Sequence, residues 1–274
     1  MCGPGTYTST RDRKLKALDG YSALIECLLP EDTSISSAHI WHGDLHVANI
    51  FVDQAEPTKI VGLIDWQSTE VAPLYFQAQQ PHIIDYDGPT VRGLERPQPP
   101  KDLDTFYATA KREAETLYLQ QSLCSLYNTL THHQDPKLYA ALEFQHTTSY
   151  TLLLLACTLL IDGEASYLLQ VAELQSKWSN LPEAKSTPYP FTFSAKDREA
   201  MDADVEGAVR GMEAMRAIRE EIGELFPEQG IVRHEQYEEA LDALRQMKEQ
   251  VIEEFARNEE VRKACEEEVW PFGT

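Results

Sequence analysis

Apolar residues recur at helical spacing over most of this chain. Residues 11–29 carry leucines on one face of a helix, and Pro30 ends the run. The same spacing predicts helices at later positions, namely 104–132, 136–161, 163–178, 195–225 and 233–268. Most of the chain is therefore predicted to be helical.

Two short runs differ, because they are rich in Ile, Val and Phe and are bounded by turn residues. They cover residues 49–53 and 59–64, with Pro57 in the turn between them. This pattern predicts an antiparallel β-hairpin. The outer ends of a hairpin lie side by side, so Asn49 and Asp65 are expected to be neighbours. The predicted class is α+β, predominantly α.

A link marked by prolines between residues 181 and 193 suggests how the chain is organised. We predict a main lobe over residues 1–190 and an extension over residues 191–274. The extension is predicted to be a C-terminal helical hairpin, with its turn at 227–230.

Charge and composition narrow the range of partners. The 274 residues include 24 basic and 45 acidic ones, a net charge of −21, which argues against nucleic acid as a partner. The apolar run at 151–161 is too short to cross a bilayer, so no membrane span is expected. The five cysteines are scattered and odd in number, and no signal peptide is visible, which favours an intracellular, cytoplasmic location.

The candidate chemistry lies in the pattern H-x-D-x-x-x-x-N over residues 42–49, followed by Asp65 after the second hairpin strand. Asp44 leaves a predicted strand at 39–41, where its carboxylate can accept the proton of an attacking hydroxyl. We interpret Asp44 as the catalytic base. Asn49 and Asp65 offer the hard oxygen atoms that Mg²⁺ prefers, so we interpret them as metal ligands.

Two other interpretations of the polar residues stay open. His42, Asp44 and His46 alternate along the chain, so they are also a candidate metal cluster of a hydrolase. Asp85 and Asp87 follow in a segment rich in turn residues, and they either contact a substrate or form turns.

The segments HGDLHVANIFV and IDW resemble the aminoglycoside phosphotransferase and choline kinase-like superfamily, in a fungal branch that includes the altered inheritance of mitochondria protein 9 group. The resemblance implies a kinase-like larger lobe, ATP and Mg²⁺ as cofactors, and a small-molecule acceptor of unknown identity. It implies that His42 braces the catalytic loop, and that mitochondria are an alternative location. Gly43 stands where protein kinases have Arg, which favours a small-molecule or atypical kinase over a regulated protein kinase.

The nucleotide-binding smaller lobe of such a kinase is expected to be absent. The glycines upstream of the motif are Gly3, Gly5 and Gly20, and none forms the glycine-rich turn that covers the phosphates. The isolated chain is therefore expected to be inactive, and the competing interpretation is a non-catalytic scaffold. An apolar seam near Ile40, Trp41 and Ile64 is expected to stay open and to promote self-association or binding of a partner protein.

Overall fold

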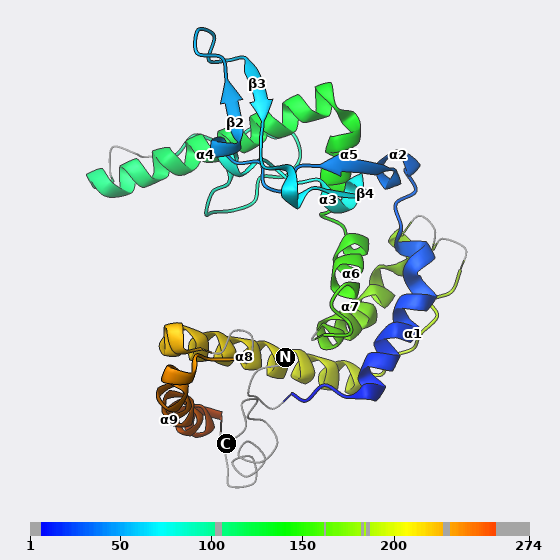
Figure 1. Cartoon of the computed structure of the whole chain (residues 1–274). Coiled ribbons are helices and arrows are strands. Elements are labelled where there is room, and N and C mark those ends of the chain that lie inside the picture. Colours follow the sequence, from blue (N-terminus) through cyan, green and yellow to red (C-terminus); the bar gives the residue numbers. More distant parts are fainter. Residues whose placement is uncertain are drawn as a thin grey trace. The chain divides into compact units, whose positions relative to one another are not determined.

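The computed structural model describes residues 7–101, 106–161, 163–181, 184, 187–226 and 231–255 (Figure 1). The chain forms two compact units. We name one unit, residues Pro30–Tyr150, the catalytic-loop unit after the predicted catalytic loop at residues 42–49. The helical unit comprises Met1–Leu29 together with Thr151–Thr274. The first helix belongs to the helical unit because it packs with a helix that follows residue 163. The predicted boundary after residue 190 stays a prediction.

Among its described residues, the catalytic-loop unit contains two small antiparallel sheets. β2 (Ile50–Val52) pairs with β3 (Ile60–Leu63), which confirms the predicted hairpin, and Figure 1 shows it projecting beyond α4 (Ala108–Gln134). β1 (Ala38–Trp41) pairs with β4 (Glu70–Pro73). β4 was not predicted, because it is short and ends at a proline. Its local sequence does not indicate a strand, and it forms one by hydrogen bonding to β1.

Short helices connect these strands to the longer ones of the same unit. α2 (Thr33–Ser36) and α3 (Leu74–Gln77) both pack against α5 (Pro136–Phe144). α5 follows α4 directly and packs against it. The rings of Tyr75 and Phe144 meet edge to face with centroids 5.3 Å apart, which joins α3 to α5.

The helix predicted over 136–161 is interrupted. α5 ends at Phe144, and a separate helix, α6, covers Thr148–Ala156. Thr147 explains the break: its hydroxyl donates to Phe144 O (2.6 Å) and accepts from Tyr150 N (3.2 Å). A threonine in this role competes with continued helix and begins a new one.

In the described part of the helical unit, four long helices pack one on the next: α1 (Arg11–Leu28), α7 (Glu164–Lys177), α8 (Ala195–Ile222) and α9 (Tyr237–Phe255). α8 and α9 share an apolar cluster of Ile218, Ile222, Leu244 and Val251. The predicted turn at 227–230 and the predicted helix beyond residue 255 lie outside the described residues. Within the described residues, none of the helices is long and apolar enough to cross a membrane.

Candidate active site

His42 connects the catalytic loop to the end of the β2–β3 hairpin. Its side chain is buried, and its Nε2 lies 2.8 Å from Ile64 O. A carbonyl oxygen only accepts, so this ring nitrogen carries the proton and donates. The ring also meets Trp66 edge to face, with centroids 4.7 Å apart. The loop is thereby held against the strand that precedes Asp65.

Asn49 is buried and closes the same loop from its other end. Its amide nitrogen donates to Asp44 O at 2.9 Å and lies 3.2 Å from His46 Nε2. Its backbone carbonyl accepts from Ile64 N at 3.1 Å. Because the amide nitrogen is engaged within the loop, the amide oxygen is the side-chain atom left to bind a metal.

Asp44 has a fixed backbone and an accessible carboxylate. Its carbonyl accepts from His46 N (3.1 Å) as well as from the Asn49 amide. The side chain is 47% exposed, and Oδ2 lies 3.6 Å from His46 Nε2. The loop therefore positions this carboxylate without burying it, which suits a group that meets an incoming hydroxyl.

Asp65 follows β3 in the left-handed backbone conformation, with φ 65° and ψ 54°. Among the described residues, Asp65 is the only one other than glycine that has a positive φ. The Trp66 indole closes the turn by donating to Leu63 O at 3.0 Å. Since Ile64 is hydrogen-bonded to Asn49, Asp65 lies one residue beyond that contact, at the end of the hairpin where Asn49 lies.

The geometry disfavours the hydrolase interpretation of His42, Asp44 and His46. The His42 ring is engaged by Ile64 O and Trp66, while His46 Nδ1 accepts from Ala48 N at 3.2 Å. Across the part of the chain that the structure describes, no three His, Cys, Asp or Glu side chains are grouped to hold a metal ion.

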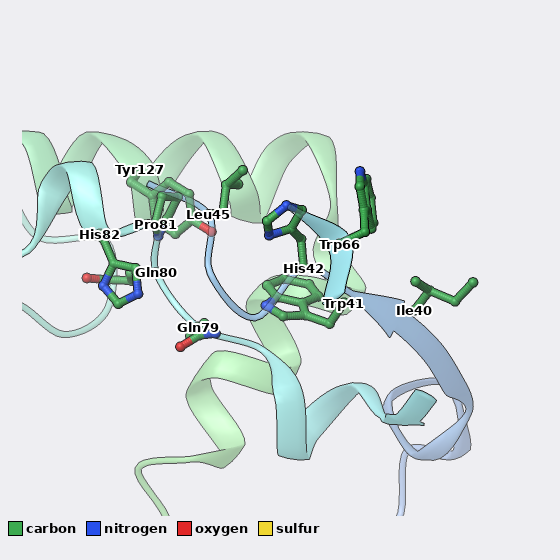
Figure 2. A pocket seen from close by; sticks show the side chains of 10 residues that line it. All are labelled: Ile40, Trp41, His42, Leu45, Trp66, Gln79, Gln80, Pro81, His82 and Tyr127. Atoms are coloured by element: carbon green, nitrogen blue, oxygen red, sulfur yellow. The ribbon is translucent and has the colours of Figure 1, made fainter. Parts of the chain in front are cut away.

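A pocket of about 220 Å³ borders the catalytic loop (Figure 2). His42 and Leu45, on either side of Asp44, line it together with Trp66, which follows Asp65. The rest of its wall comes from Ile40, Trp41, residues 79–82 and Tyr127 of α4. The helical pattern predicted α4, but no signal in it indicated that Tyr127 lies beside the loop. A second pocket of about 350 Å³ is lined by Gly43 and Glu70 among others, and it shares Trp41 and Gln79 with the first.

The two candidate substrate carboxylates lie in different places. Asp85 Oδ2 is 2.8 Å from His82 Nδ1, and His82 lines the 220 Å³ pocket. Asp87 instead lines a shallow hollow on α4 beside Arg112 and Glu113. Asp85 is thus connected to the pocket at the catalytic loop through a histidine.

Comparison with known proteins bears on the first part of the chain. Residues 6–76 match the profile of the phosphotransferase enzyme family, a segment that includes α1, the catalytic loop, the hairpin and Asp65. This match supports a kinase-like phosphotransferase class for that segment. No solved structure matches the chain.

The chain is also similar to proteins named subtelomeric hrmA-associated cluster protein from two strains of Aspergillus fumigatus. Each is 23% identical to it over 222 residues. The alignment covers 80% of this chain and 42% of each relative. The chain therefore spans about two fifths of the length of these relatives.

Proposed function

We propose that the catalytic-loop unit is the catalytic part of a kinase-like enzyme that transfers a phosphoryl group from ATP to the hydroxyl of a small molecule. The observation that carries the proposal is the hydrogen bond from Ile64 N to Asn49 O, 3.1 Å long. It holds Asn49 at the strand end that leads into Asp65, while the Asn49 amide bonds Asp44 O. A base and two oxygen ligands around one loop suit phosphoryl transfer.

Asp44 and His42 have different roles in this reaction. Asp44 accepts the proton of the acceptor hydroxyl as that oxygen bonds to the terminal phosphorus of ATP. The bond from this phosphorus to the β-phosphate oxygen breaks, and ADP leaves. His42 is a positioning residue, since it touches Ile64 O and Trp66 and holds the loop in place.

Asn49 and Asp65 fit Mg²⁺ by the chemistry of their donor atoms. An amide oxygen and a carboxylate are hard ligands, and the contacts of the Asn49 amide nitrogen leave its oxygen available. When bound, Mg²⁺ neutralises charge on the phosphates. Asp65 is exposed at the hairpin end, so its carboxylate is accessible to a solvated ion.

Calorimetric titration of ATP with Mg²⁺ into the 274-residue chain tests the proposal. We expect weak binding, because the sequence contains no glycine-rich turn and strand lysine to hold the phosphates. Asp65→Ala is expected to abolish the binding. The matched control is Glu56→Ala, which removes an exposed carboxylate from the turn of the same hairpin and should leave the binding unchanged.

Two results would count against these expectations. Equal binding by wild type and Asp65→Ala would remove Asp65 from the metal site and with it the proposed mechanism. Tight binding by the wild type would show that other residues of the chain hold the phosphates.

A non-catalytic interaction protein with the same fold is the second candidate. The exposure of Ile40 (67%) and Ile64 (46%) favours it, because both lie next to the catalytic loop where a partner could bind. No detectable nucleotide binding by the wild-type chain would support this candidate over the first.

A further inference from the structure

We propose that the 220 Å³ pocket beside the catalytic loop binds the acceptor, and that the acceptor is a small, uncharged alcohol with a flat apolar ring. This inference rests on the proposed function, because it assigns the substrate class of the same site. It starts from the position of the pocket. His42, two residues before Asp44, Leu45, the residue after it, and Trp66, the residue after Asp65, all line the pocket.

The lining is mainly aromatic and apolar. Trp41, Trp66 and Tyr127 contribute large rings, and Figure 2 shows Trp41, His42 and Trp66 together on one side of the pocket. Aromatic side chains favour a flat ring, which stacks on their faces or meets their edges. A ligand with an apolar body is therefore favoured over a sugar, whose hydroxyl groups would lose hydrogen bonds to water on burial.

The charge of the lining argues against a polyamine or an aminosugar as the acceptor. None of the ten lining residues is Asp, Glu, Lys or Arg, although the chain as a whole carries a net charge of −21. A polyamine or aminosugar needs carboxylates to replace its water shell. The acidic character of the chain does not extend to this pocket.

A few polar atoms remain to orient a hydroxyl group. The Gln79 amide nitrogen donates to Gly43 O (3.4 Å), and that of Gln80 donates to Asn128 Oδ1 (3.3 Å). Both glutamines therefore keep an amide oxygen that can accept from an alcohol. Few polar groups in an apolar wall are typical of a small-molecule site.

His82 supplies the best-defined polar contact. Asp85 Oδ2 lies 2.8 Å from His82 Nδ1, which orients the imidazole and leaves Nε2 as its second polar atom. We assign His82 as a specificity residue that hydrogen-bonds the acceptor through Nε2. Asp85 is its positioning residue.

The volume limits the size of the acceptor. The volume of the pocket is about 220 Å³. Pockets for drug-sized ligands begin near ~300 Å³. A single ring bearing a short hydroxyl group matches this space.

The chain can be tested with benzyl alcohol as the probe and NMR of its tryptophans labelled with ¹⁵N in the indole ring. Trp41 and Trp66 line the pocket, whereas Trp178 is buried in the helical unit and donates to Thr187 O. We expect benzyl alcohol to shift the Trp41 and Trp66 signals saturably and to leave Trp178 unchanged. Putrescine, a dication, and myo-inositol, a polar ring, should shift neither signal at the same concentrations.

Variants locate the binding site. His82→Ala should weaken benzyl alcohol binding roughly threefold to tenfold, the effect of one lost hydrogen bond. The matched control is His133→Ala, which removes an exposed histidine at the end of α4 and should change nothing. An unchanged Trp178 signal reports that each variant is folded.

Several outcomes would overturn the inference. These are no shift up to the solubility limit of the alcohol, a stronger response to putrescine or myo-inositol, and equal weakening by both histidine variants. Failure of the proposed function is separable, because benzyl alcohol binding needs no nucleotide. If benzyl alcohol shifts the signals but the chain binds no nucleotide, the proposed function alone is wrong. If the chain binds nucleotide, loses this binding in Asp65→Ala and shows no shift with benzyl alcohol, this inference alone is wrong.

Discussion

Asp65 shows how one backbone conformation serves the proposed metal site. Its φ of 65° lies in the left-handed region, which costs an L-residue roughly 1–2 kcal/mol, although aspartate tolerates it better than most. This conformation turns the chain directly after β3. Residues held in such conformations gather at functional sites, where the surrounding contacts maintain them. Here those contacts are the bonds of Ile64 to Asn49 and of Trp66 to Leu63.

Substitution of Asp65 separates its backbone role from its chemical role. Asp65→Gly should keep the free energy of unfolding close to the wild-type value, whereas Asp65→Ala should lower it by about 1 kcal/mol relative to Gly, because alanine is strained at positive φ. Urea unfolding followed by tryptophan fluorescence measures the difference.

The control for this prediction is the same pair of substitutions at Glu56, where φ is not positive. There alanine should be at least as stable as glycine. Equal stability of the two variants at position 65 would mean that the left-handed turn does not persist in solution.

At the scale of elements, Glu164 joins α7 to the start of the chain. The side chain is fully buried, and its carboxylate accepts from Tyr7 Oη (2.8 Å) and Lys14 Nζ (3.2 Å). Burial raises the pKa of Glu164, but its hydrogen bonds outweigh this effect and hold the pKa below the ordinary value of 4.5. Burial and the hydrogen bond to Glu164 raise the pKa of Tyr7.

We predict that Glu164→Gln lowers the free energy of unfolding by about 1–3 kcal/mol at neutral pH, because Tyr7 and Lys14 lose a charged acceptor. Folding lowers the pKa of this carboxyl, so the ionised group stabilises the protein at pH values above its ordinary pKa of 4.5. This stabilisation is lost as the pH falls through the pKa of the folded state. The difference between wild type and variant should therefore shrink in acid.

Urea unfolding at a series of pH values checks this prediction. Glu199→Gln, an exposed position on α8, is the matched control and should have little effect at any pH. A wild-type advantage that grows as pH falls would contradict the assigned direction of the Glu164 pKa.

At the scale of the whole molecule, apolar side chains are exposed around the catalytic loop. Ile40 on β1 and Ile64 after β3 are both largely accessible, and Val71 on β4 lies opposite Ile40. Trp41, the third residue of the expected seam, is partly covered and lines both pockets. Soluble monomers seldom expose large contiguous apolar patches.

We expect the purified chain to self-associate through this seam. Ile40→Lys should lower the average mass measured by light scattering across a dilution series, because a buried lysine disfavours the contact. Ile231→Lys is the matched control, since Ile231 is exposed in the helical unit. A clean monomer at all concentrations, with no binding of a hydrophobic dye, would rule the prediction out.

The sequence alone indicated the elements whose signals are local. Leucine spacing and Pro30 predicted α1 closely, and the Ile- and Val-rich runs predicted the β2–β3 hairpin. A hairpin pairs residues that are close in the chain, so the spacing alone predicted that Asn49 and Asp65 lie near each other. The roles of Asp44, His42, Asn49 and Asp65 stay predictions, since no measurement of activity tests them.

Tertiary structure decided what depends on contacts between distant segments. β4 forms because β1 is available to pair with it, and α5 stops at Phe144 because Thr147 begins a new helix. Tyr127 reaches the pocket only because α4 packs beside the catalytic loop. Residue spacing predicts a periodic face or a tight turn, but it does not encode which faces pack together. The packing of distant elements places α1 against α7 and creates the pocket.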